Sequence, residues 1–119
     1  MNIHEHQAKQ LLKKYGAVVP EGIFALNVED LLQKAKSLKT EKYVLKAQIH
    51  AGGRGKGGGV KLAKSLEDLK SISEEIIGMQ LITPQTPREG KRVNQVLVAE
   101  DVYYPGESEP SEFYICSIK

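Results

Sequence analysis

A glycine-rich stretch near the middle of the chain limits the fold more than any other feature of the sequence. Six of the eight residues in the range 52–59 are glycine, and the other two are Arg54 and Lys56. Residues 42–50 before this stretch and residues 60–63 after it have the short, apolar character of strands. The glycine-rich stretch therefore connects two strands, and the sequence predicts a sheet at this point.

Glycines and cations together suit this loop for holding an anion. A backbone without Cβ atoms can come close to a ligand, and consecutive free N–H groups form a concave anion site. Arg54 and Lys56 would add positive charge where phosphates would lie.

Two common phosphate-binding motifs are excluded. A P-loop needs Ser or Thr after Gly-Lys, but Gly57 follows Lys56, and His50 stands where the first glycine belongs. Gly53, Gly55 and Gly58 have the spacing of a dinucleotide-binding fingerprint. That motif opens a helix, however, whereas residues 60–63 predict a strand. The remaining alternatives are a loop that folds over a nucleotide, or a long hairpin loop or flexible linker. Linkers favour Gly and Ser without a paired Arg and Lys, which supports the first alternative.

The strand before the loop carries a lysine in an uncommon place. Side-chain alternation puts Leu45 and Ala47 on one face and Lys46 with Gln48 on the other. Lysine is rarely found between apolar neighbours in mid-strand. Lys46 is therefore either fixed against a phosphate or part of an edge strand with one solvated face.

Helical periodicity and capping residues predict three helices, at residues 2–15, 28–38 and 66–77. Their expected N-caps are Asn2, Asn27 and Ser65. The apolar face of the first helix consists of Ala8, Leu11, Leu12 and Tyr15. Further strands are expected at residues 80–83, 93–99 and 111–118. This order predicts an α+β fold, a two-layer α/β sandwich in which helices cover one side of an open sheet.

Composition narrows the function classes. The chain has 119 residues, 40% of them hydrophobic, which suits one soluble domain or a piece of a larger one. A net charge of +2 is too small to indicate a nucleic-acid partner. Cys116 is the one cysteine, so no intrachain disulfide forms, and we expect a buried small side chain in a cytoplasmic protein. No apolar run approaches the roughly 20 residues of a membrane span.

Histidines and carboxylates allow weaker predictions. His4 and His6 are two residues apart on the first expected helix, so they should point to different sides, with surface or capping roles rather than metal binding. His50 borders the loop and has either a nucleotide contact or a structural hydrogen bond. Glu100 and Asp101 end an expected strand, where carboxylates bind ribose or magnesium or simply face solvent.

These motifs resemble a known family. The strings Asn2-Ile3-His4-Glu5-His6-Gln7-Ala8-Lys9 and Lys46-Ala47-Gln48-Ile49-His50-Ala51-Gly52-Gly53-Arg54-Gly55-Lys56, continued by Asn94-Gln95-Val96-Leu97-Val98, are similar to the beta subunits of succinate–CoA ligase, in the ATP-grasp superfamily. The resemblance covers all of residues 1–119, which correspond to the N-terminal part of the ATP-grasp domain. His6 stands where the family usually has tyrosine.

The resemblance implies a set of ATP contacts. They are Lys46, the loop segment Gly53, Arg54 and Gly55, the hinge residues Glu100 and Val102, and Glu112. It implies no catalytic residue and no metal ligand in this stretch, with the Mg²⁺ ligands and the CoA-ligase domain beyond Lys119. The isolated stretch should therefore be inactive.

The resemblance also implies a reaction and a partner. ATP, succinate and CoA would interconvert with ADP, phosphate and succinyl-CoA through a phosphohistidine on an alpha subunit, in the citric acid cycle of the bacterial cytoplasm. We expect neither nucleic acid nor membrane as partners. The alternatives are another ATP-grasp acyl-CoA ligase, of the malate–CoA ligase or ATP-citrate lyase type, or a non-catalytic module that binds anions or nucleic acid.

Overall fold

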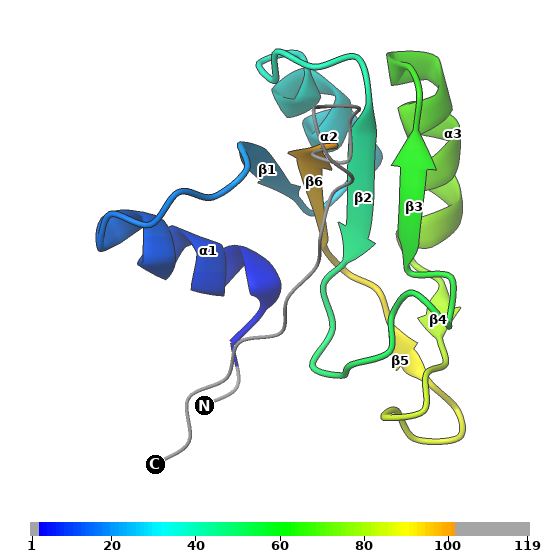
Figure 1. Cartoon of the computed structure of the whole chain (residues 1–119). Helices are drawn as coiled ribbons and strands as arrows, with labels where there is room; N and C mark the ends of the chain where they lie inside the picture. Colours follow the sequence, from blue (N-terminus) through cyan, green and yellow to red (C-terminus); the bar gives the residue numbers. More distant parts are fainter. Residues whose placement is uncertain (1–2, 102–119) are drawn as a thin grey trace, which may run out of the picture.

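A four-stranded antiparallel sheet forms the centre of the structure, a computed structural model that describes residues 3–101 (Figure 1). Its strands lie in the order β1 (Gly22–Ala25), β6 (Val96–Glu100), β2 (Tyr43–Ala47) and β3 (Val60–Ala63). A separate two-stranded sheet consists of β4 (Gln80–Leu81) and β5 (Lys91–Arg92). Strand β2 lies between β6 and β3, so Lys46 belongs to an inner strand. The edge-strand alternative for Lys46 is therefore wrong.

Helices α2 (Val28–Ala35) and α3 (Leu66–Ile76) cover one face of this sheet (Figure 1). Leu45 and Val98 are cross-strand neighbours on that face, and both are fully buried. Leu31 and Leu69 of the two helices pack into the same core. This arrangement confirms the predicted α+β fold and the strand alternation of β2.

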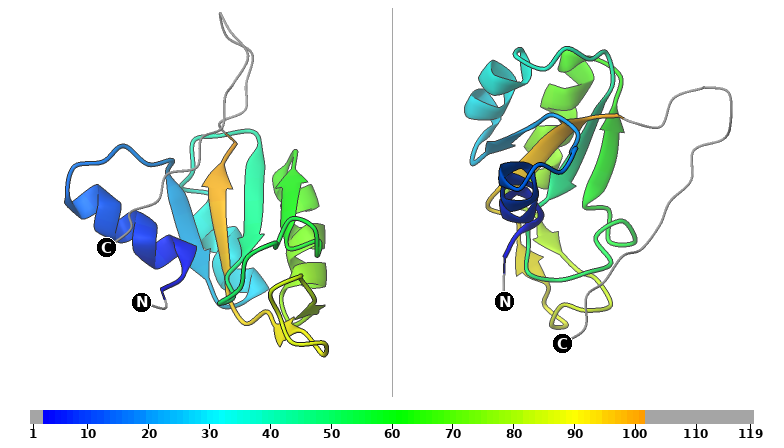
Figure 2. Two further views of the ribbon diagram at one scale, coloured as in Figure 1. Left: turned by 60° about the horizontal axis from the view of Figure 1, so that its bottom comes forward. Right: turned by 60° about the vertical axis from the view of Figure 1, so that its left-hand side comes forward.

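Helix α1 (Glu5–Lys14) is the exception to the one-sided layer (Figure 2). The ring of His6 stacks on Phe24 of β1, with centroids 4.0 Å apart. The sheet register pairs Phe24 with Leu97 and Leu97 with Lys46, so these side chains share the face opposite to α2 and α3. Helix α1 therefore lies on the face of the sheet that carries Lys46.

Two of the three predicted N-caps are confirmed. The Asn27 side chain accepts a hydrogen bond from the backbone of Asp30 at 2.8 Å, and that of Ser65 accepts one from Asp68 at 3.1 Å. Each such cap stabilises its helix by about 1 kcal/mol. The first helix differs, because it begins at Glu5 with His4 as the N-cap. Asn2 lies outside the described residues.

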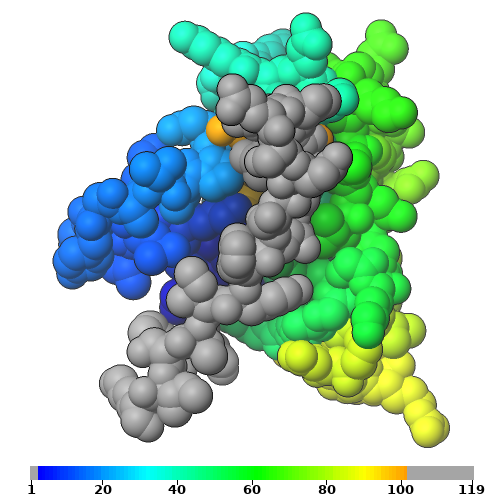
Figure 3. Space-filling model, viewed as in Figure 1, coloured from blue at the N-terminus to red at the C-terminus, as the bar shows by residue number. Residues whose placement is uncertain are grey.

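The apolar face predicted for the first helix does not face the core. Leu11, Leu12 and Tyr15 are 46%, 52% and 80% exposed, and α1 projects from the side of the molecule (Figure 3). Only His6 of this helix is buried. Periodicity identifies an apolar stripe but not what covers it, and here the helix meets the sheet through its first two turns.

The strand predicted at residues 93–99 is divided in the structure. The Val93 N–H donates to the Met79 carbonyl oxygen, whereas Val96 pairs with Ala25 and Ala47. The chain thus passes from the small sheet to the large one between Val93 and Val96, and continuous pairing cannot persist across that change. The strand expected at residues 111–118 lies outside the described part.

Within residues 3–101, no helix is long and apolar enough to cross a membrane.

Candidate functional site

The glycine-rich loop is folded into a compact turn rather than extended as a linker. The Gly59 N–H donates to the Arg54 carbonyl oxygen at 2.8 Å, and the Lys56 N–H donates to the Gly53 carbonyl oxygen at 3.1 Å. Gly53 has φ +75°, which L side chains rarely adopt. A Cβ on Gly57 would overlap the Ile82 carbonyl oxygen. The glycines therefore allow a fold that other residues would block.

Three cations converge on one carboxylate beside this loop. Lys46 Nζ lies 2.9 Å from Glu5 Oε1, and Arg54 Nη2 lies 2.8 Å from Glu5 Oε2. Lys9 Nζ, one helical turn along α1, lies 3.2 Å from Glu5 Oε1. Arg54 also donates through Nη1 to the Ala47 carbonyl oxygen at 2.8 Å. The strand, the loop and α1 are thus joined at a single charged cluster, which we call the Glu5 cluster (Glu5, Lys9, Lys46 and Arg54).

The charge of Glu5 is stabilised in this setting. Burial by itself would raise the pKa of the carboxyl group, but the hydrogen bonds and charges of Lys46 and Arg54 outweigh burial and lower the pKa to about 2. Glu5 stays ionised at neutral pH, so the Glu5 cluster has three positive charges and one negative charge. Its net positive charge favours an anionic ligand.

A cavity of about 680 Å³ opens next to the Glu5 cluster. Its lining includes Glu5, Arg54 and His50 together with the loop backbone at Gly53 and Gly55. The backbone N–H groups of residues 53–55 have no hydrogen-bond partner among residues 3–101. Free N–H groups beside a guanidinium group are the donors that a phosphate accepts.

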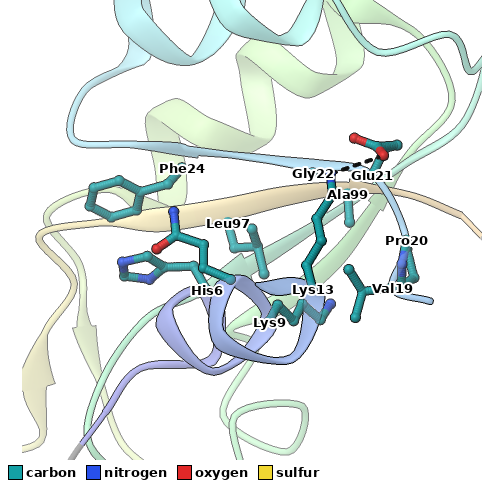
Figure 4. A pocket seen from close by; sticks show the side chains of 11 residues that line it. His6, Lys9, Lys13, Val19, Pro20, Glu21, Gly22, Phe24, Leu97 and Ala99 are labelled. Carbon is teal, nitrogen blue, oxygen red and sulfur yellow. Dashed lines mark hydrogen bonds and ion pairs between the residues drawn. The ribbon is translucent and has the colours of Figure 1, made fainter. Parts of the chain in front are cut away.

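A second cavity, of about 230 Å³, lies between α1 and the sheet (Figure 4). Gly22, Phe24, Leu97 and Ala99 give it an apolar floor on the Lys46 face of the sheet. Its opposite wall includes Lys9, which also belongs to the Glu5 cluster. The first turns of α1 therefore lie between a polar cavity and a more apolar one.

The histidines stack against one another instead of pointing to different sides. The ring centroids of His4 and His50 are 3.9 Å apart, and those of His4 and His6 are 5.7 Å apart. The prediction was wrong because His4 precedes the helix as its N-cap, so helical spacing does not apply to the pair. Of the predicted surface or capping roles, capping is confirmed for His4, the N-cap of α1. A surface role is wrong for His6, because its side chain is buried against Phe24.

The surroundings of His4 disfavour its protonated form. Burial, and then the nearby charges of His50, His6 and Arg54, lower the pKa of His4. Its Nε2 lies 2.7 Å from the Gln95 side-chain nitrogen, which makes it the acceptor of that hydrogen bond in the neutral tautomer. Among residues 3–101, no group of three or more His, Cys, Asp or Glu side chains is placed to hold a metal ion.

The structure brings together some of the predicted site residues and separates others. Lys46 and Arg54 share the Glu5 cluster, whereas Glu100 pairs with Tyr43 and so lies on the opposite face of the sheet. The Glu100 carboxylate accepts a hydrogen bond from the Glu21 N–H at 3.3 Å. Val102 and Glu112 lie outside the described residues.

Two residues at the site were not singled out by the sequence. Glu5 is 41 residues from Lys46, and no local spacing connects them. Gln48 was placed on the polar face of its strand, but not as the side chain that accepts from the His6 N–H at 2.9 Å. Both contacts depend on how α1 docks, which only the fold reveals.

Comparison with known proteins gives the family. Residues 2–115 match the ATP-grasp domain. The chain is similar to the proteins named "Succinate--CoA ligase [ADP-forming] subunit beta" of Flavobacterium johnsoniae, at 64% identity over 119 residues, and of Pelagibacter ubique, at 56% over 115 residues. Each alignment covers 97% of this chain, and 30% and 28% of the two relatives, so the chain spans about three tenths of their length. The match over nearly all of its residues shows that the chain belongs to the ATP-grasp family.

Proposed function

We propose that this region is the nucleotide-binding part of an ADP-forming succinate–CoA ligase beta subunit. The observation that carries the proposal is the meeting of Lys46 and Arg54 at one carboxylate, beside the free backbone N–H groups of residues 53–55. This donor set suits the phosphates of ATP, which accept from cations and amides without a protein base. The names of similar proteins support ATP and ADP as the nucleotides.

In this proposal each site residue has a role. Lys46 acts as a point charge on the phosphates, and Arg54 with the N–H groups of Gly53 and Gly55 holds their oxygens. Glu100, Val102 and Glu112 would contact the rest of the nucleotide. Glu100 lies on the face of the sheet opposite to Lys46, so it would reach the nucleotide only past the end of β6.

Magnesium would accompany the nucleotide, but residues 3–101 supply no cluster of ligands for it. When bound, Mg²⁺ would neutralise phosphate charge. The succinate and CoA chemistry and the alpha-subunit partner are further parts of the proposal, supported by the names of the similar proteins. The phosphohistidine on that partner and a cytoplasmic location are proposed from the family resemblance alone. The contribution of this region is to bind and orient the nucleotide.

Replacement of Lys46 tests the proposal. In the complete beta subunit assembled with its alpha subunit, Lys46→Ala should raise the Kd for Mg·ATP by on the order of tenfold or more, because one charge-assisted contact is lost. Calorimetric titration measures the change. Lys61→Ala is the matched control, since Lys61 lies on the neighbouring strand β3 and is exposed. Equal affinities of wild type and Lys46→Ala would contradict the proposal.

A titration with a mixed-sequence oligonucleotide separates the proposal from an anion-binding module without catalysis. We expect no oligonucleotide affinity that depends on Lys46. Oligonucleotide binding without Mg·ATP binding would favour the non-catalytic alternative.

A further inference from the structure

The carboxylate of Glu5 has no assigned role, although it touches both cations proposed to bind the nucleotide. We propose that Glu5 is a positioning residue that holds Lys46 and Arg54 in the arrangement that binds phosphate. This inference rests on the proposed function. The alternative role is competition, in which the carboxylate occupies the proposed phosphate site and must leave before the nucleotide binds. Three observations favour positioning over competition.

The first observation is that the backbone around Glu5 is fixed. Gln48 directly follows strand β2, and its Oε1 accepts a hydrogen bond from the His6 N–H at 2.9 Å. The His6 ring nitrogen Nδ1 lies 3.1 Å from the same oxygen. The His4 N–H donates to Gln7 Oε1 at 2.8 Å. Glu5 lies between these two anchored residues in the first turn of α1, where a carboxylate is also favoured by the helix dipole. The anchored backbone keeps the base of the Glu5 side chain beside Lys46 and Arg54, which suits a residue that positions them.

The second observation is that Glu5 leaves donors available. An ammonium group has three N–H donors and a guanidinium group has five. Among residues 3–101, Lys46 Nζ contacts only Glu5, and Arg54 uses one nitrogen on Glu5 and another on the Ala47 carbonyl oxygen. Both cations can therefore stay on Glu5 and still have N–H donors for a ligand. Arg54 lines the cavity directly, and Lys46 lies behind it on the same carboxylate.

The third observation concerns repulsion. Lys46 and Arg54 lie within hydrogen-bonding distance of the two oxygens of one carboxylate, so their charges are close together. Without Glu5 the two cations would repel each other, and the flexible lysine stem would turn toward solvent. A single fixed carboxylate allows them to converge before the ligand arrives, which is the usual meaning of preorganisation.

The test replaces Glu5 by glutamine in the complete ligase, the beta subunit with its alpha subunit. Glu5→Gln should raise the Kd for Mg·ATP by on the order of tenfold, because misplaced donors lose binding and rate steeply. The direction of the change in Kd distinguishes positioning from competition. Removing a negative charge would by itself tighten the binding of an anion, so weaker binding reports lost geometry. Unchanged or tighter binding would overturn the inference, and tighter binding would indicate competition.

Asp30→Asn is the matched control. Asp30 is also a carboxylate in the first turn of a helix, and it also pairs with a lysine four residues on, Lys34, at 3.0 Å. It touches neither Lys46 nor Arg54, so its replacement should leave the Kd for Mg·ATP unchanged. If Glu5→Gln lowers the Tm much more than Asp30→Asn does, Glu5→Asp replaces it in the test. Glu5→Asp keeps the charge but withdraws it by one methylene, and weaker binding is expected again.

A double-mutant cycle separates positioning from a general structural effect. In the Lys46→Ala background, Glu5→Gln should change the Kd by much less than in wild type, because one of the cations it positions is gone. An undiminished effect would overturn the inference. If Lys46→Ala weakens binding but Glu5→Gln does not, only the role of Glu5 fails. If Lys46→Ala has no effect, the proposed function fails and the positioning role with it.

Discussion

The rings of His4 and His50 stack with their centroids 3.9 Å apart and their planes at 19°. This contact joins the residue that caps α1 to the residue at the entrance of the glycine-rich loop. A positive charge on the His4 ring would be partly buried and would lie beside other basic groups, and both effects disfavour it. The lowered pKa of His4 follows from burial first and from the neighbouring His50 and His6 next.

The first prediction is a loss of stability in mild acid that depends on His4. Its pKa in the folded chain lies below the ordinary value of 6.5, so the unfolded chain binds more protons between those two values. Stability therefore falls as the pH decreases from about 6.5 toward the folded pKa. The Tm of wild type should drop from pH 7.5 to pH 5 by more than that of His4→Phe, which keeps a stacking ring without a titrating group. Parallel Tm curves for the two proteins would show the prediction to be wrong.

The second prediction concerns Glu5 in stronger acid. Its pKa falls from 4.5 to about 2 on folding, so the stability it provides is complete above pH 4.5 and is lost as the pH falls toward 2. Glu5→Gln should remove that part of the pH dependence while lowering stability at neutral pH. Urea unfolding at pH 7, 4 and 3 measures both effects. If the free energy of unfolding of wild type and of Glu5→Gln fell equally with decreasing pH below 4.5, the prediction would be contradicted.

The third prediction compares two glycines of the same loop. A Cβ on Gly57 would overlap the Ile82 carbonyl oxygen, whereas a Cβ on Gly55 would meet nothing within 4 Å. Gly57→Ala should therefore lower the free energy of unfolding by about 1–3 kcal/mol, the usual cost of overpacking. Gly55→Ala should change it by less than about 0.5 kcal/mol. Urea denaturation of both variants tests the difference, and equal losses would mean that the loop does not pack against Ile82.

Local signals explain most of what the sequence predicted correctly. Asn27 and Ser65 cap their helices by accepting a hydrogen bond from the backbone N–H three residues later. This contact depends only on neighbouring residues, so the sequence alone can predict it. The alternation of Leu45 and Lys46 between two faces follows from strand geometry alone. The strand after the loop, which excluded a dinucleotide turn, was also correctly predicted.

Features that depend on docking were not predictable. Glu5 reaches Lys46 and Arg54 only because α1 lies on their face of the sheet, and no spacing encodes that placement. The exposure of Leu12 has the same origin, since an apolar stripe is equally compatible with a core and with a free surface. The candidate ATP contacts were predicted from the family resemblance, and their binding roles remain predictions.

Ala47 uses both of its backbone groups on the glycine-rich loop. Its N–H donates to the Gly59 carbonyl oxygen at 2.8 Å, and its carbonyl oxygen accepts from Arg54 at 2.8 Å. Opening the loop therefore requires the end of β2 to fray, because the hydrogen bonds of Ala47 to Gly59 and Arg54 would have to break. Loop opening and strand fraying become one event of local unfolding. The amide proton of Ala47 would then exchange with solvent at the rate at which the loop separates from the end of β2.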